Sequence, residues 1–221
     1  TPAVFTEIPS VQPYMKDSYG LHANLMLGES EDGKNYKFKN LLGYLCLNLT
    51  GDKCVKSIEL TNNDGAYIAG VLYYQMSNIN NAGWNTNVSS LITLDCGEGV
   101  LLSSDSAKPT AFWLTLPPQL FAEGFVITIY DDKGIAYVKS TSKPYAIDRN
   151  MIQPMKAVDV AGDTVLDIEE NDGKVLFYLA ERSGSVRSLS GIAKRDWLAS
   201  KVMLVSSRAI TFTWTGWVPL R

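Results

Sequence analysis

The sequence predicts an all-β protein, and three observations support this. Short apolar segments of four to seven residues recur between residues 38 and 129. Turn-forming Asn, Asp, Gly and Pro residues separate them at intervals of roughly 10 to 20 positions. Several segments alternate between apolar and polar residues, the period of a strand with one buried face. This combination is typical of a β-sandwich or barrel.

Composition argues against a nucleic-acid-binding or membrane-spanning protein. The chain has 221 residues, a formal net charge of -3, 46% hydrophobic and 19% charged residues. Its 20 Lys and Arg residues are scattered, so no basic face is expected and nucleic acid is not an expected partner. No run approaches the roughly 18 to 20 apolar residues of a membrane span. Residues 1–20 lack a signal-peptide pattern, so we expect any secretion signal to have been removed or never to have existed.

The first elements are irregular. Three prolines in residues 1–35 predict a lead-in, followed by one strand around Leu21–Leu27 and a polar turn at 29–34. A second extended segment starts at Tyr36 and continues through Leu49. It is either two strands or one bent strand, with Gly43 as a candidate bulge.

Two hairpins are predicted next. Val55–Thr61 alternates and meets a turn at Asn62–Gly65, so Ala66–Tyr74 is expected as its return strand. The Asn-rich segment Ser77–Ser90 then reads as a polar loop, either a contact loop or a crossover between sheets.

The second hairpin comes later. Strands are expected at Ser89–Cys96, Val100–Leu102 and Ala111–Leu116. Gly124–Tyr130 alternates, and a turn at residues 131–134 leads into Ile135–Lys139 as its partner.

Two unequal units are expected. Residues 1–155 suffice for a sandwich of seven or more strands. Residues 156–221 form a smaller β-rich unit, too short for a full core and therefore expected to pack on the first. One modest helix is conceivable over 192–202, and the chain is extended near its end.

The three cysteines carry little signal. Cys46, Cys54 and Cys96 show no metal-binding spacing, and Cys46 is expected as a small buried side chain. A disulfide of Cys54 with Cys96 or with Cys46 is compatible with an oxidising compartment, and the sequence does not choose between them.

A family resemblance covers roughly residues 35–156. The segments 38–51, 55–61 and 68–70, then Phe112–Pro118, Gly124–Asp131 and Ile147–Ile152, follow the order of strand motifs in the N-terminal domain of fimbrillin-like proteins of the Bacteroidales. The chain resembles that family. No match is found after Met155.

The resemblance implies a secreted, lipid-anchored surface protein related to the stalk, tip or anchor subunits of type V pili. It implies a transthyretin-like N-terminal sandwich, a place on the cell surface, anchored to the outer membrane or within a fimbrium, and other fimbrial subunits or further copies of itself as partners. Membrane contact would come only through a lipid anchor that this chain does not contain.

One candidate assembly element lies near the end. Ile210, Phe212 and Trp214 alternate with threonines, so this segment has the pattern of a strand that is donated to a sheet edge. The alternative is an ordinary internal strand of the second unit.

Two tripeptides resemble the acceptor pattern of Bacteroidales O-glycosylation. They centre on Ser106 and Thr164, and both are expected in loops.

Catalysis, cofactors and metal ions are not expected. His22 is the single histidine and is expected on a strand without a nucleophile motif. Asp131-Asp132 is interpreted as a hairpin turn, and the adjacent side chains of Glu169-Glu170 would point to opposite faces of a strand. No phosphate loop or dinucleotide fingerprint is present.

The resemblance therefore implies a non-catalytic adhesion or fimbrial assembly component that uses β-strand addition. The alternative is a surface glycan-binding β-sandwich protein, in which exposed aromatics contact sugars or a partner. The candidates for such contacts are Tyr73, Tyr74, Trp84 and Trp217, with Trp214 as a further aromatic.

Overall fold

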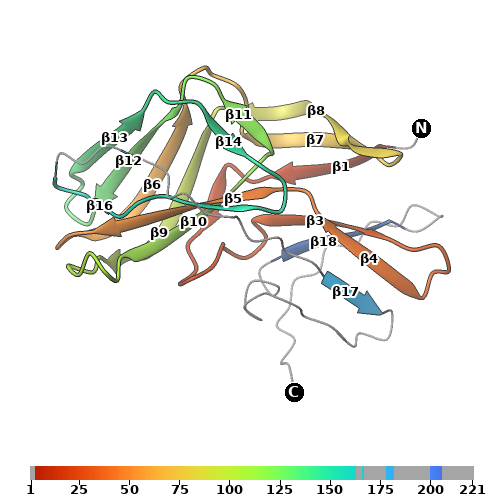
Figure 1. The fold of residues 1–221 in the computed structure, drawn as a ribbon, viewed down its shortest axis with the longest axis horizontal. Coiled ribbons are helices and arrows are strands. Elements are labelled where there is room, and N and C mark those ends of the chain that lie inside the picture. The colour runs from red at the N-terminus through yellow and green to blue at the C-terminus, as the bar shows by residue number, and fades with distance from the viewer. Residues whose placement is uncertain (1–2, 163–165, 167–177, 182–199, 206–221) are drawn as a thin grey trace.

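The computed structural model describes residues 3–162, 166, 178–181 and 200–205 (Figure 1). These residues contain strands and no helix, which confirms the all-β prediction. The specifically transthyretin-like arrangement stays a prediction.

The strands have the following bounds: β1 Ala3–Ile8, β2 Val11–Pro13, β3 Asn24–Glu29, β4 Asn35–Asn40, β5 Gly43–Thr50, β6 Cys54–Asn62, β7 Ala69–Gln75, β8 Asn78–Ser89, β9 Leu91–Leu101, β10 Thr110–Leu116, β11 Gln119–Phe121, β12 Phe125–Asp131, β13 Ala136–Thr141, β14 Tyr145–Ile147, β15 Ile152–Pro154, β16 Val158–Asp159, β17 Tyr178–Glu181 and β18 Ser200–Val205.

Two sheets form the sandwich. The β6 sheet has the order β13-β12-β6-β9-β2, and the β5 sheet has the order β10-β5-β15, with β16 also paired to β5. Inward side chains of β6, β9 and β12 share one core cluster with those of β5 and β10. The alternating burial of β12 is the pattern of a strand with one face in that core.

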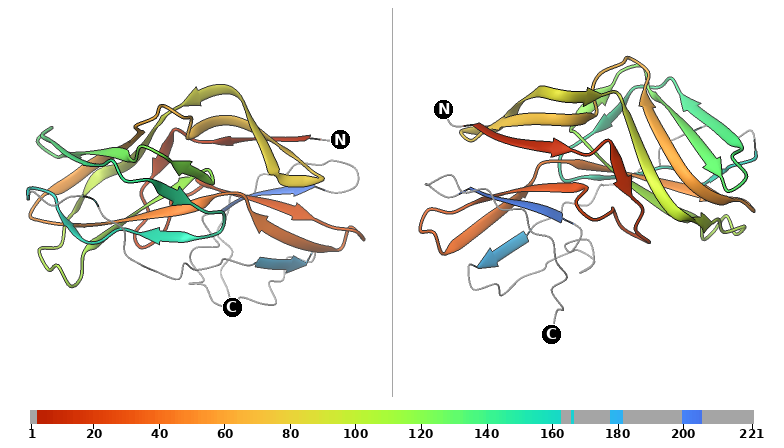
Figure 2. Two further views of the ribbon diagram at one scale, coloured as in Figure 1. Left: turned by 45° about the horizontal axis from the view of Figure 1, so that its top comes forward. Right: turned by 180° about the vertical axis from the view of Figure 1, so that it is seen from behind.

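Two further sheets extend the sandwich. The β7 sheet has the order β1-β7-β8, and the β3 sheet has the order β17-β4-β3-β18. Both project toward the same end of the molecule, away from the β12–β13 hairpin (Figures 1 and 2). A separate pair joins β11 to β14.

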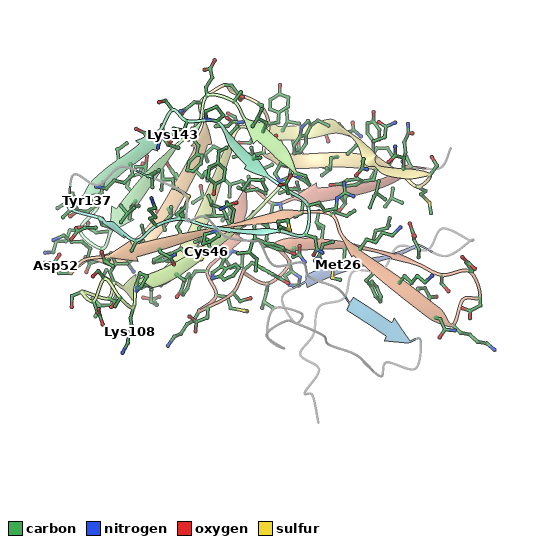
Figure 3. All side chains as sticks on the ribbon, in the orientation of Figure 1. Met26, Cys46, Asp52, Lys108, Tyr137 and Lys143 are labelled. Carbon is green, nitrogen blue, oxygen red and sulfur yellow. The ribbon has the colours of Figure 1, made fainter. Side chains whose placement is uncertain are left out.

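The core runs through all four of these sheets. Val4 and Ile8 of β1 and Leu25 and Leu27 of β3 belong to the same buried cluster as the sandwich interior. In Figure 3, Met26 lies near the start of the β3–β4 hairpin, whereas Asp52, Lys108 and Tyr137 lie at the opposite end of the molecule. The sandwich and its extensions are therefore one packed body over the described residues.

The predicted β6–β7 hairpin is wrong. The turn itself forms, because Gly65 adopts a φ of 74° and its N–H donates to the Asn62 carbonyl at 3.2 Å. However, β6 pairs with β12 and β9, while β7 pairs with β1 and β8. The turn therefore carries the chain from one sheet to another, which local turn chemistry does not reveal.

The predicted loop at residues 77–90 is also wrong. It is β8, a strand of 12 residues at one edge of the β7 sheet. Its pairing with β7 is interrupted by three register shifts. An edge strand with such irregularities tolerates many polar residues, which explains why an Asn-rich sequence forms a strand here.

The predictions for the β12–β13 hairpin, for residues 35–50 and for residues 192–202 have different outcomes. The β12–β13 hairpin forms as predicted, with Gly134 at a φ of 76°. Residues 35–50 form two strands, and Gly43 begins β5 instead of lying in a bulge. A Cβ at Gly43 would clash with the Asp148 carbonyl, so a close backbone approach requires this glycine. Of the helix conceived over 192–202, the described residues 200–202 are in β18.

Candidate functional site

The β3–β4 hairpin takes both of its outer partners from the far end of the chain. β18 pairs with β3 in parallel, from Ser200 opposite Asn24 to Val205 opposite Glu29. β17 pairs with β4 antiparallel. The sheet order β17-β4-β3-β18 places one of these strands on each side of the hairpin, and both are blue in Figure 1. The hairpin edges are thus acceptors for strands that are distant in sequence.

β3 is suited to hold a strand at its edge because both of its faces are buried. Leu25 and Leu27 belong to the main core. Met26, on the opposite face, clusters with Tyr19 and Tyr44. A strand buried on both faces offers its backbone groups in a sheltered setting, where unpaired N–H and C=O groups would be costly.

A chain of buried polar side chains fixes the base of the hairpin. The Tyr44 hydroxyl donates to Asn24 Oδ1 at 2.9 Å, and Asn24 Nδ2 donates to Asn40 Oδ1 at 3.1 Å. Asn40 Nδ2 in turn donates to Asn150 Oδ1 at 2.6 Å. These bonds connect β3 and β4 to β5 and to the segment before β15, so they set where the acceptor edge lies.

The predicted donor residues Ile210, Phe212 and Trp214 lie outside the described residues. The strand that occupies the β3 edge, β18, ends before them at Val205. Sequence reasoning missed β18, since its apolar run was attributed in part to a helix.

The predicted aromatic contacts that lie within the described residues do not share one surface. Tyr73 points to the outer face of the β7 sheet, and Tyr74, the next residue, is 2% exposed in the core. Burial raises the pKa of Tyr74 to about 12, partly offset by the nearby charge of Arg149. Trp84 pairs in register with buried Leu72 and packs on the core. Trp217 lies outside the described residues.

Sequence reasoning did not include Phe5. Its side chain is 56% exposed, and its ring centroid lies 6.2 Å from that of Tyr73. The prediction of an irregular lead-in is wrong for residues 3–8, which form β1 with alternating burial that turns Phe5 outward. The pairing of β1 with β7 then brings the two rings together.

Of the two candidate glycosylation residues, Ser106 is described and Thr164 is not. Ser106 is exposed in the turn between β9 and β10. The Asp105 carboxylate accepts a hydrogen bond from the Ala107 N–H at 2.9 Å, which holds Ser106 at the tip of this turn.

Among the described residues, the titratable side chains considered in the sequence do not converge. His22 is exposed in a turn with a φ of 64°, so its predicted position on a strand is wrong. Asp131 and Asp132 lie at the β12–β13 turn as predicted, and Glu169-Glu170 lies outside the described residues. The described residues contain no group of three or more His, Cys, Asp or Glu side chains placed to hold a metal ion. Nor do they include a helix with the length and apolar content needed to cross a membrane.

No protein-family model and no curated protein matches the chain. A proposed cell adhesion protein of Bacteroides ovatus ATCC 8483 is similar with a TM-score of 0.40 and 10% identity, over 62% of this chain and 46% of its own. One from Bacteroides uniformis ATCC 8492 has a TM-score of 0.35 and 15% identity, over 61% of this chain and 52% of its own.

The tip fimbrial protein Mfa3 of Porphyromonas gingivalis, truncated at its C-terminus, is similar with a TM-score of 0.31 and 12% identity, over 65% of this chain and 52% of its own. The chain thus spans about half the length of these proteins. Two of them are proposed cell adhesion proteins and one is a tip fimbrial protein, which is the class that the sequence resemblance indicated.

Proposed function

We propose that this chain is a non-catalytic adhesion or fimbrial assembly component of the cell surface that assembles through β-strand addition. The observation that carries the proposal is the parallel pairing of β3 with β18. Six residues at one end of the chain accept six residues from the other end along a continuous register. A strand held in this way can be exchanged for the same strand of another copy.

Exchange would conserve the contacts within each acceptor site. The edge of β3 would remain paired, and Leu25, Leu27 and Met26 would stay buried, whichever copy supplied the strand. The free-energy difference between the two arrangements therefore lies mainly in the connecting chain. In this proposal the partners are further copies of the chain or other fimbrial subunits, and anchoring to the outer membrane is part of the proposal.

Two further expectations belong to the same proposal. Residues 209–214 supply or extend the donated strand through Ile210, Phe212 and Trp214. The division into a sandwich of residues 1–155 and a smaller unit of residues 156–221 then separates an acceptor part from a donor part.

Ser106 is proposed as an O-glycosylation site of the surface protein, together with Thr164. Its exposed place at the tip of a turn supports access by a transferase. The test is the intact mass of the protein from its native host, with and without Ser106→Ala. The parent protein should be heavier than its polypeptide alone, and Ser106→Ala should reduce this excess mass. An unchanged excess would contradict the site.

The assembly proposal is tested by cross-linking between copies. One copy carries Glu29→Cys and an affinity tag, the other carries Val205→Cys, and both carry Cys54→Ser to remove the half-exposed native thiol. The two are refolded together and treated with a short bismaleimide. We expect a covalent dimer of tagged and untagged chains, because Glu29 and Val205 are register partners.

Two controls test whether the cross-link reports the pairing of β3 with β18. Val138→Cys, at an exposed site of β13 in the β6 sheet, replaces Val205→Cys and should give no dimer. A single chain with both Glu29→Cys and Val205→Cys should cross-link internally, which verifies the pairing. Internal cross-linking without any mixed dimer would show that β18 stays in its own chain and would overturn assembly at this edge.

A further inference from the structure

The outer face of the β7 sheet carries three rows of residues across β1, β7 and β8. The register places Phe5 opposite Tyr73 and Tyr73 opposite Gly83 in the central row. The inward neighbours Val4, Thr6 and Ile8 are buried, so Phe5 and its row face outward. This face lies on a different sheet from the β3 acceptor edge.

Gly83 fixes the position of the Tyr73 ring. A Cβ at residue 83 would lie 2.6 Å from the Tyr73 hydroxyl oxygen and 2.7 Å from two of its ring carbons. The ring therefore lies directly over the β8 backbone, in space that only a glycine leaves free. Phe5 stands beside it at an interplanar angle of 55°. The Tyr73 ring is therefore held in position, and the Phe5 ring beside it is exposed.

The surroundings of this pair are polar but almost uncharged. Asn81 and Asn85 flank Gly83 along β8, and both are exposed. The first row consists of Ala3, Gln75 and Asn78, the central row of Phe5, Tyr73 and Gly83, and the third row of Glu7, Val71 and Thr86. Glu7 is the single charged residue in these three rows. Side-chain amides offer both donors and acceptors without net charge.

We infer that Phe5, Tyr73 and the exposed amides of β8 form a binding surface for the neutral pyranose rings of a glycan. An aromatic face complements the apolar C–H face of a sugar ring, while amides pair with its hydroxyl groups. The near absence of charge complements a neutral polyhydroxyl ligand and disfavours a polyanion, which would require basic side chains. The set differs from that proposed on the sequence alone, because Tyr74 and Trp84 face inward and Phe5 replaces them.

The test uses the full chain and three neutral probes, maltohexaose, cellohexaose and mannohexaose, with hexagalacturonate as the anionic probe. Binding is measured by isothermal titration calorimetry. We expect at least one neutral probe to bind, and Phe5→Ala and Tyr73→Ala each to weaken it about tenfold. Tyr73→Phe keeps the ring and should retain most of the affinity. Gly83→Ala displaces the ring and should weaken binding like Tyr73→Ala.

Matched controls distinguish binding at this site from nonspecific binding and from misfolding of the variants. Val138→Ala removes an equally exposed apolar side chain from the β6 sheet and should leave binding unchanged. Circular dichroism of each variant should match that of the parent chain. Failure of all three neutral probes to bind, equal affinity in Phe5→Ala and the parent, or preference for hexagalacturonate would each overturn the inference. Because the β3 edge is not involved, none of these results bears on strand exchange.

Discussion

The side-chain amide of Gln12 pairs with the backbone of Thr115 in the way that a neighbouring β-strand would. Gln12 Nε2 donates to the Thr115 carbonyl at 2.9 Å, and the Thr115 N–H donates to Gln12 Oε1 at 2.9 Å. Both backbone groups of Thr115 therefore point away from β5, the strand that pairs with β10 on the other side. A side-chain amide of β2 closes the edge of β10 at this position.

A second edge is restrained in a related way. Lys139 lies on β13, the edge strand of the β6 sheet, and its side chain is buried. Its ammonium group donates to the Gly162 carbonyl. Inward lysines and side-chain plugs are devices that keep sheet edges from pairing at random. In contrast, the edge of β3 is occupied by a complete strand.

Gln12→Ala should destabilise the fold strongly. Gln12 is fully buried, and its loss leaves the N–H and C=O of Thr115 without their partner. We expect the free energy of unfolding to fall by about 2 to 4 kcal/mol, measured by urea denaturation. Val11→Ala, at an exposed neighbouring site, should change it by less than about 0.5 kcal/mol. Equal effects of the two variants would contradict the pairing.

Gln12→Glu should make stability depend on pH. A carboxylate cannot donate to the Thr115 carbonyl, and burial favours its neutral form, so the folded pKa of Glu at this site should exceed the unfolded value. The folded state then binds the proton more tightly, and stability should decline as pH rises from about 4 toward 7, relative to the parent chain. Urea midpoints of both chains at pH 4, 5, 6 and 7 measure this, and parallel pH curves would contradict it.

Tyr44→Phe should loosen the base of the β3–β4 hairpin. The substitution removes one buried hydroxyl donor and leaves Asn24 Oδ1 without that bond, while the ring stacked on Tyr19 is retained. We expect a loss of about 1 to 2 kcal/mol in unfolding free energy. Tyr36→Phe removes a hydroxyl whose bond is long, 3.4 Å, and should cost much less. Hydrogen exchange should also show faster exchange in β3 and β4 for Tyr44→Phe only.

Asp131 should contribute to acid sensitivity. Burial raises its pKa, but the amides of Ile135 and Lys133 and the Tyr137 hydroxyl donate to the carboxylate and hold the pKa below its ordinary value. A depressed folded pKa gives stability that is present above the unfolded value and is lost as pH falls through the folded value. Unfolding midpoints between pH 2 and 6 should fall less steeply for Asp131→Asn than for the parent chain.

The cysteines should react in a defined order. All three are free thiols; Cys54 is half-buried, whereas Cys46 and Cys96 are buried. Burial, with smaller contributions from Asp95 and Cys54, raises the pKa of the Cys96 thiol to about 12, so little thiolate forms at pH 8. Alkylation with iodoacetamide followed by mass spectrometry should therefore modify Cys54 first. A chain two hydrogens lighter, or modification of Cys96 as fast as Cys54, would contradict this assignment.

Local sequence determined the elements whose partners are near in the chain. The alternation of residues 125–130 and the Asp131–Gly134 turn specify the β12–β13 hairpin completely, because both strands and the turn geometry lie within a few residues. The all-β class follows from short apolar segments, the turn residues between them and the two-residue period of several segments.

Tertiary structure decided where those strands go. The same turn chemistry at Asn62–Gly65 leads to a crossover because β6 finds its neighbours in β12 and β9. β8 is extended despite its asparagines because β7 supplies the backbone partners that composition cannot indicate. The β3 edge, the Gln12–Thr115 pair and the Phe5–Tyr73 pair all join residues that are far apart in sequence. Such contacts depend on burial and pairing over the whole chain, so periodicity, which reports only on neighbours along one strand, leaves them undetermined.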